Sequence, residues 1–189
     1  MATVADKTYT PEDLLALPDS TIYELVDGQL VERNMGALSS WVGGQLFRLL
    51  DAYCRVHNLG WVWPADSSYQ CFPDRPNMVR RPDVSFIQRG RLPGERIPEG
   101  HITIPPDLAV EVISPNDRAY EVDEKLEEYL RAGVPMVWIV NPETHTVRIH
   151  RGDGTFGFLR EQDELTGENV IPGFQCSVRE LFPAVAASE

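Results

Sequence analysis

Glu111 is the first candidate for chemistry, because it lies inside an apolar segment, residues 108–113. The segment is short, rich in β-branched residues and bounded by Pro106 and Pro115, which predicts a buried strand. Strands of this kind are usually covered on both faces of an α/β sheet. An ionised carboxylate there is strongly unfavourable unless a cation, a metal ion or hydrogen-bond donors compensate it. We therefore expect Glu111 to have a specific partner.

A second carboxylate, Asp83, follows Pro82 at the head of another apolar segment, residues 84–87. If the two predicted strands pair, the side chains of Asp83 and Glu111 can point to the same edge of the sheet. Two carboxylates a few ångströms apart raise each other's pKa or bind a hard cation such as Mg²⁺. Neither segment contains histidine or cysteine, so a site for a softer metal is not indicated. The alternative is that Asp83 only accepts hydrogen bonds in a turn.

Lys125 is the third candidate, and Lys7 is the only other lysine in the chain. Residues 118–132 have helical periodicity, and Lys125 comes three residues after Val122 and four before Tyr129, at the border of the apolar face. From there it can donate to a water or a phosphate near the carboxylates. Three neighbouring glutamates are expected to face solvent: Glu121, Glu124 and Glu128. The alternative is a surface lysine paired with Glu121 or Glu128.

Two other acidic residues need an interpretation. Asp107 belongs to a second Pro-Asp pair, but it is expected at the exposed beginning of its strand and is not expected to be functional. Glu24 lies in the apolar segment 22–26, where it is either a third acidic group of the site or the partner of a buried arginine. The sequence leaves both interpretations of Glu24 open.

The elements that must position these side chains can be predicted from local patterns. Thr10 and Pro11 begin a short helix, and Asp27-Gly28 forms the turn of a hairpin over residues 23–32. A long amphipathic helix is predicted over residues 37–57, and its Gly43-Gly44 pair predicts close packing against a sheet. The remaining predicted elements are strands at 61–63, 68–72, 83–88, 108–114 and 136–140, a helix at 118–132, a strand at 146–150 leading into a hairpin through 152–154, and a short helix after Ser177. This order predicts one α/β domain over residues 1–189, with a mixed central sheet flanked by helices and β-hairpins added at both ends.

The composition is that of an ordinary globular protein, with 42% hydrophobic and 24% charged residues. No apolar run approaches the roughly 18 residues of a membrane span, and the first residues lack the pattern of a signal peptide. The three cysteines are far apart in the sequence and odd in number, which favours reduced thiols. These features predict a cytoplasmic protein that does not contact a membrane.

The net charge of −12 argues against a nucleic-acid partner. The segment from Arg75 to Arg96, however, contains six arginines and only two acidic residues, Asp83 and Glu95. One arginine-rich face on an acidic body could contact a phosphate backbone, with a steep dependence on salt. The alternative is a solvated, arginine-rich loop.

Together these residues resemble the PD-(D/E)XK nuclease superfamily, and in particular its bacterial Uma-two branch of restriction-endonuclease-like proteins. The resemblance rests on Pro82-Asp83, on Glu111 within a β-branched strand, and on Lys125 in the following helix. The matching stretches, in the expected order over nearly the whole chain, are residues 23–28, 81–84, 107–115, 125–129, 132–135, 138–140 and 172–174. The resemblance implies a restriction-endonuclease-like core.

The resemblance also implies a function, namely Mg²⁺-dependent hydrolysis of phosphodiester bonds in DNA, with Mn²⁺ as a possible substitute. Asp83 and Glu111 would be the catalytic residues that hold the metal, with the backbone carbonyl of Val112 as a further ligand. Lys125 would orient the attacking water or stabilise the transition state. The arginines between residues 75 and 96 would follow the DNA backbone, and a homodimer is a further expectation.

Two positions depart from the family pattern. Ile113 stands where the superfamily usually has its lysine, and Lys125 takes that role from the helix. Ser39 stands where the branch often has a histidine, which implies impaired activity or altered specificity. Two other functions therefore stay open: a catalytically inactive nuclease fold that serves as a binding module, and a metal-dependent phosphohydrolase that acts on nucleotides.

Overall fold

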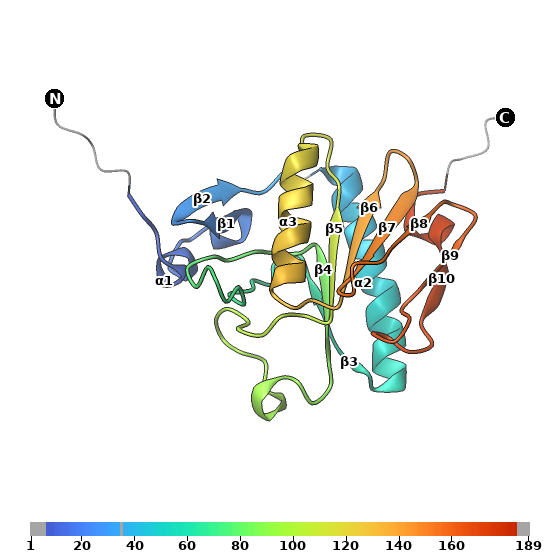
Figure 1. Cartoon of the computed structure of the whole chain (residues 1–189), viewed down its shortest axis with the longest axis horizontal. Coiled ribbons are helices and arrows are strands. Elements are labelled where there is room, and N and C mark those ends of the chain that lie inside the picture. Colours follow the sequence, from blue (N-terminus) through green and yellow to red (C-terminus); the bar gives the residue numbers. More distant parts are fainter. Residues whose placement is uncertain (1–6, 35, 185–189) are drawn as a thin grey trace.

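A six-stranded mixed sheet forms the centre of the computed structural model, which describes residues 7–34 and 36–184 (Figure 1). The strand order across the sheet is β3-β4-β5-β6-β7-β8. The bounds are β3 (Gly60–Pro64), β4 (Val84–Gln88), β5 (Leu108–Val112), β6 (Met136–Asn141), β7 (Thr146–Arg151) and β8 (Phe156–Leu159). Only β5 and β6 pair in parallel, and α3 connects them, as a parallel crossover requires. The predicted mixed sheet is confirmed.

Two helices cover the two faces of this sheet. Successive residues of a strand point to opposite faces, so Val110 belongs to the core cluster under α2 (Ala37–His57). Its neighbour Ala109 belongs to the cluster under α3 (Ala119–Arg131). In Figure 1, α3 crosses in front of the sheet and α2 lies behind it. The long helix has the predicted bounds because its apolar stripe is continuous and Asn58 ends it in a left-handed conformation.

Smaller elements are added at both ends of the chain. Thr10 caps α1 (Pro11–Leu15) through a capping box, and the 3-10 helix η1 (Ser20–Ile22) leads into the hairpin. The hairpin consists of β1 (Tyr23–Val26) and β2 (Gln29–Glu32), with positive φ at Asp27 and Gly28, as a two-residue turn requires. The remaining elements are η2 (Pro93–Glu95), β9 (Glu164–Thr166), β10 (Gln175–Ser177) and η3 (Val178–Leu181). The N-terminal hairpin and the β9-β10 pair lie at opposite ends of the molecule (Figure 1).

The predicted strand over residues 68–72 is wrong. Tyr69 forms isolated bridges to Arg80 and Ile102, and its neighbours form no ladder. Its side chain is fully buried, and its hydroxyl lies 2.6 Å from the hydroxyl of Ser85. The apolar character of this segment therefore reflects packing of an irregular loop against the sheet, which a strand pattern in the sequence cannot distinguish from ladder formation.

The glycine pair of α2 does not make the close contact with the sheet that was predicted. A Cβ atom at Gly43 would lie 3.8 Å from Cβ of Asp83, which is an ordinary contact. A Cβ atom at Gly44 would have no atom within 4 Å. Close packing against the sheet is therefore not the reason for Gly44.

Two predictions from composition can be compared with the structure. All three cysteines are buried and unpaired, in agreement with the expectation of reduced thiols. Across residues 7–34 and 36–184, none of the helices combines the length and the apolar character needed to cross a membrane.

Candidate functional site

Asp83 and Glu111 lie close together where β4 begins and β5 ends. β4 and β5 are antiparallel with Val84 opposite Val110, so Asp83, directly before β4, lies beside the residues that follow Val110. The backbone N–H of Asp83 donates to the carbonyl of Val110 at 2.9 Å. The Oδ2 atom of Asp83 accepts the backbone N–H of Val112 at 2.7 Å. The strand pairing therefore brings the two predicted carboxylates together.

Glu111 has the specific partners that its burial requires. Its side chain is 11% exposed, and the hydroxyl of Tyr129 donates to Oε1 at 2.8 Å. The Nζ atom of Lys125 lies 3.3 Å from Oε2. Lys125 and Tyr129 are four residues apart on α3, so both reach the same strand from one helix face. Burial raises the pKa of Glu111 to about 7, because Asp83 and Glu24 add to the burial effect and Lys125 and Tyr129 only partly oppose it.

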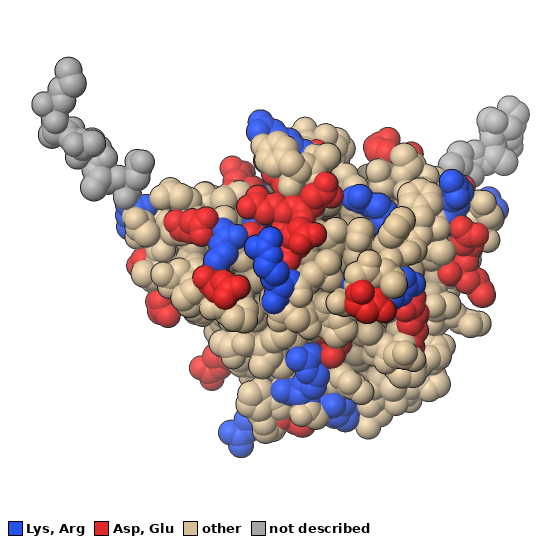
Figure 2. Space-filling model, in the orientation of Figure 1, with Lys and Arg blue, Asp and Glu red and all other residues tan. Residues whose placement is uncertain are grey.

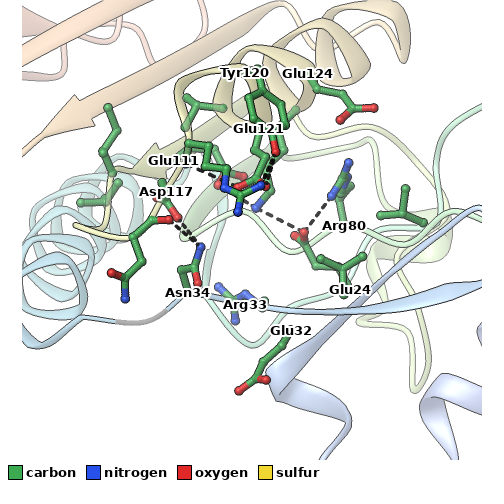
Figure 3. Close-up of a pocket in the computed structure, with 18 residues that line it drawn as sticks. Glu24, Glu32, Arg33, Asn34, Arg80, Glu111, Asp117, Tyr120, Glu121 and Glu124 are labelled. Atoms are coloured by element: carbon green, nitrogen blue, oxygen red, sulfur yellow. Dashed lines mark hydrogen bonds and ion pairs between the residues drawn. The ribbon is translucent and has the colours of Figure 1, made fainter.

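Glu24 of β1 is a third carboxylate near Asp83 and Glu111, and the interpretation that it pairs with a buried arginine is confirmed. Its Oε2 atom lies 3.2 Å from Nζ of Lys125 and 2.9 Å from a guanidinium nitrogen of the buried Arg80. Its Oε1 atom accepts the backbone N–H of Arg81 at 2.9 Å. Burial alone would raise the pKa of Glu24, but Lys125 and Arg80 lower it to about 2. Figure 3 shows Glu24 between Arg80 and the side of the pocket that carries Glu111. Glu24 is therefore ionised throughout the physiological range.

Lys125 contacts the carboxylates of the cluster and not its helical neighbours. Its ion pairs are with Glu24 and Glu111, so the alternative of a surface lysine paired along the helix is wrong. Burial by itself would lower the pKa of Lys125, but these two carboxylates raise it above its ordinary value. Lys125 is therefore a fixed positive charge at neutral pH, and it cannot act as a base there.

The prediction that Glu128 faces solvent is also wrong. Glu128 is 5% exposed and forms ion pairs with Arg80, at 2.7 Å, and with Arg75. Both arginines come from the irregular segment between β3 and β4, which folds against α3. Helical spacing cannot indicate a contact that an irregular segment brings from about fifty residues away.

Arg33 is a site residue for which the sequence carries no recognisable signal. It directly follows β2, and its guanidinium lies 3.2 Å from Oδ1 of Asp83, fifty residues along the chain. The Arg33 side chain is 6% exposed. Both members of the Asp83–Glu111 pair thus contact a cationic side chain from another element. Burial nevertheless raises the pKa of Asp83, with the Val112 N–H, Arg33 and Lys125 opposing the effect.

Two hollows meet at this cluster. The main hollow, of about 500 Å³, is lined by Glu24 and Arg33 on the hairpin side and by Glu111, Tyr120 and Lys125 on the other (Figure 3). The second hollow, of about 200 Å³, lies against α2. Its lining includes Asp83, Arg33, Ser39, Gly43 and Gly44. Arg33 therefore borders both hollows, Glu111 borders the main one and Asp83 borders the second.

Ser39 and Asp107 both have structural contacts. The Ser39 hydroxyl lies 2.7 Å from the hydroxyl of Ser114 and accepts the backbone N–H of Gly36 at 3.1 Å, at the beginning of α2. Asp107 is buried, contrary to the prediction that it lies at an exposed strand end. It accepts the Gln88 N–H at 2.8 Å and pairs with Arg91 at 2.8 Å. These bonds tie β4 to the segment before β5, and Asp107 lines neither hollow.

The six arginines between residues 75 and 96 do not all lie on the surface, so they do not form the single arginine-rich face that the sequence suggested. Arg80 and Arg81 are buried, and Arg81 donates to backbone carbonyls of Tyr23 and Ser20 at 3.0 and 3.2 Å. Arg75 pairs with Asp27 at 2.8 Å as well as with Glu128. On the face that carries α3, basic and acidic atoms lie side by side without a continuous basic band (Figure 2). Most of the positive charge in this segment is used within the fold.

The donor set of the cluster fits a hard cation. Asp83 and Glu111 are each anchored through one oxygen by a short bond, from Val112 N–H at 2.7 Å and Tyr129 hydroxyl at 2.8 Å. The other oxygen of each contacts a cationic side chain at the longer distances of 3.2 and 3.3 Å. Within the part of the chain that the structure describes, no group of three or more His, Cys, Asp or Glu side chains is arranged to hold a metal. Mg²⁺ commonly uses only one or two carboxylates and keeps several waters, so two carboxylates are compatible with it.

The chain has recognisable relatives in sequence and in structure. The profile of the Uma2 family, described as "Putative restriction endonuclease", matches residues 11–179. The crystal structure of a protein from Anabaena variabilis ATCC 29413, described as "a putative nuclease belonging to DUF820", is similar with a TM-score of 0.76. The two sequences are 19% identical, and the similarity covers 92% of this chain and 97% of the other, which establishes a shared fold. No curated protein matches the chain. Because the family profile covers most of its length, the chain belongs to the Uma2 family.

Proposed function

We propose that this protein is a divalent-metal-dependent endonuclease that hydrolyses phosphodiester bonds in DNA. Membership of the Uma2 family supports nuclease chemistry in general. The observation that carries the proposal is the pair of neighbouring carboxylates, Asp83 and Glu111, each with one oxygen anchored by a short hydrogen bond and the other at a longer distance from a cationic side chain. Asp83 and Glu111 would hold Mg²⁺ or Mn²⁺, with the backbone carbonyl of Val112 as a further ligand.

The anchoring bonds give each carboxylate a defined orientation. The Val112 N–H fixes Asp83, and the Tyr129 hydroxyl fixes Glu111, so little side-chain entropy is lost when the second oxygens take a new partner. A bound divalent cation would lower the pKa of a coordinated water and offset the charge of the scissile phosphate. Because burial raises the pKa of Glu111 to about 7, a divalent cation placed beside this carboxylate would stabilise its ionised form.

Lys125 would serve as a permanently charged hydrogen-bond donor. Glu24 and Glu111 raise its pKa, so it stays protonated and can donate to a phosphate oxygen or to the attacking water. Glu24 holds the ammonium from the hairpin side at 3.2 Å and therefore positions it at the border of the main hollow. In this role Glu24 acts through Lys125 and does not itself contact the substrate.

The proposal can be tested with conservative variants. Wild-type protein is incubated with plasmid DNA, single-stranded DNA and RNA in Mg²⁺ and in Mn²⁺, and Mn²⁺ binding is measured by calorimetry. Asp83→Asn and Glu111→Gln should abolish both metal binding and DNA cleavage, whereas Lys125→Met should abolish cleavage and retain metal binding. Asp107→Asn is the matched control, because Asp107 is also a carboxylate that follows a proline and pairs with an arginine, but it lines neither hollow. Full cleavage by the Asp83 or Glu111 variant would refute the assignment.

One observation favours a second candidate, a binding module without catalytic activity. Lys125 and Arg33 already compensate Glu111 and Asp83 within the fold, so the carboxylates have partners without a metal ion. A module of this kind would bind no Mn²⁺ and cleave none of the three nucleic acids. The same calorimetric titration therefore separates the two functions.

A further inference from the structure

The buried side chain of Arg33 makes long hydrogen bonds. Its side chain is 6% exposed, yet its hydrogen bonds to the described residues are one at 3.2 Å to Asp83 Oδ1 and another at 3.4 Å to the carbonyl of Thr21. Ion-paired N–H···O bonds are typically about 2.7–2.9 Å long. A guanidinium has five N–H donors, so much of the bonding capacity of Arg33 is not used in these two contacts.

Arg80, in the same cluster, is an arginine with a structural role and can be compared with Arg33. It lies 2.9 Å from Glu24 and 2.7 Å from Glu128, so two buried carboxylates share its guanidinium. Arg33 has a single carboxylate partner at a longer distance. Arg80 borders the main hollow only, whereas Arg33 borders both hollows. Arg33 therefore has space on two sides into which its guanidinium can turn.

The balance of charges in the site also indicates that a cationic side chain changes its ion-pair partner when metal and substrate bind. Asp83 and Glu111 are balanced by Arg33 and Lys125, and Glu24, the second partner of Lys125, is also paired with Arg80. A divalent cation added to this group would leave two positive charges uncompensated. A phosphodiester and an attacking hydroxide together bring two negative charges, which restores the balance if Arg33 and Lys125 turn towards them. When a cation takes Glu111, Lys125 would keep Glu24 as a partner, whereas Asp83 is the one carboxylate partner of Arg33 among the described residues. Arg33 is therefore the side chain that has to change its partner.

We propose that Arg33 is a further substrate-contacting residue, which pairs with Asp83 in the metal-free protein and transfers to the substrate phosphate when a divalent cation takes Asp83. This inference rests on the proposed endonuclease function. Its consequence is that Arg33 competes with the metal for Asp83 while it favours binding of the nucleic acid. Metal and substrate therefore assist each other, because each one removes a cost that the other would meet alone.

The test compares Arg33→Gln with the wild type in two separate binding measurements. Mn²⁺ alone is titrated by calorimetry, and a fluorescein-labelled DNA oligonucleotide is titrated in Ca²⁺ by fluorescence anisotropy. We expect Arg33→Gln to bind Mn²⁺ about fivefold more tightly, since a competing ion pair is lost, and the oligonucleotide about tenfold more weakly. Arg91→Gln is the matched control, because Arg91 pairs with Asp107 at 2.8 Å and lines neither hollow. It should leave both affinities unchanged.

The opposite signs of the two effects separate this role from a structural one. Loss of a merely structural arginine would weaken the binding of both Mn²⁺ and the oligonucleotide. Weaker or unchanged Mn²⁺ binding by a folded Arg33→Gln variant therefore overturns the inference. If the wild type binds no Mn²⁺, the proposed function fails and this inference fails with it. If the wild type binds Mn²⁺ and cleaves DNA while Arg33→Gln binds Mn²⁺ no more tightly, only this inference fails.

Arg33→Lys keeps the test decisive if the glutamine variant does not fold. The lysine retains the charge beside Asp83, so Mn²⁺ affinity should stay within about twofold of the wild type. The oligonucleotide should bind about threefold more weakly or worse, because an ammonium cannot bind a phosphate through two parallel N–H bonds. Wild-type oligonucleotide affinity in Arg33→Lys would overturn the inference.

Discussion

The two buried glutamates that share Lys125 are expected to affect stability in opposite directions. Glu24 has its pKa lowered from 4.5 to about 2, whereas Glu111 has its pKa raised from 4.5 to about 7. At about 1.4 kcal/mol per pH unit, each shift corresponds to about 3 kcal/mol between the ionised and neutral forms. Replacement by glutamine removes the ionisation and retains the size of the side chain. At pH 8 without metal, Glu24→Gln should therefore lower the free energy of unfolding by about 3 kcal/mol and Glu111→Gln should raise it by up to about 3 kcal/mol.

The dependence on pH distinguishes the two residues further. The lowered pKa of Glu24 means that its stabilisation is present above pH 4.5 and is lost only as the pH falls towards 2. The raised pKa of Glu111 means that its destabilisation is complete above pH 7 and disappears as the pH falls towards 4.5, where both the folded and unfolded states bind the proton. At pH 5 the gain from Glu111→Gln should thus fall below about 1 kcal/mol, and the loss from Glu24→Gln should persist.

The measurement is urea unfolding in EDTA, followed by tryptophan fluorescence at pH 8 and pH 5. The fully buried Trp138 lies in the core and provides the signal. Glu168→Gln is the matched control, because Glu168 pairs with Arg151 at 2.5 Å but is 29% exposed, so its loss should change stability by less than about 1 kcal/mol. A Glu111→Gln variant that is less stable than the wild type at pH 8 would refute the reasoning. A gain that persists unchanged at pH 5 would refute the assignment of that gain to ionisation.

Three further variants test the surroundings of the site. Gly44→Ala should raise the free energy of unfolding by about 0.5–1 kcal/mol in urea titrations, because the helix gains a better helix former and the added Cβ has no atom within 4 Å; a loss of stability would show that the position is constrained in another way. Glu128→Ala should lower it by about 3 kcal/mol or more, since Arg80 is left buried with one carboxylate partner fewer; a change below about 1 kcal/mol would contradict this. Tyr129→Phe should weaken Mn²⁺ binding about tenfold in calorimetry, because Glu111 loses the donor that orients it; unchanged affinity would remove Tyr129 from the metal site.

The elements of the fold were largely predictable because each depends on residues close in sequence. The 37–57 helix follows from one apolar stripe, and the hairpin at Asp27-Gly28 follows from the turn residues. The segment at residues 68–72 failed for the complementary reason. Its apolar side chains pack in an irregular loop, and burial without a ladder produces the same local pattern as a strand.

Local patterns in the sequence identified Glu111 as a carboxylate in need of a partner and made Asp83 and Lys125 candidates, each with a structural alternative, and the family resemblance joined the three. An apolar strand makes a charged residue conspicuous, and both neighbours occupy the ends or borders of recognisable elements. The roles of Glu24, Arg33 and Glu128 depended on long-range packing. The side chains that pair with them in these hydrogen bonds lie about fifty residues away in the sequence. Each pairing involves the hairpin or an irregular segment, and burial in three dimensions sets the path of these segments. Charge neutralisation inside a protein depends on distances of about 3 Å, and such distances follow from how the elements pack together and not from the order of residues along the chain.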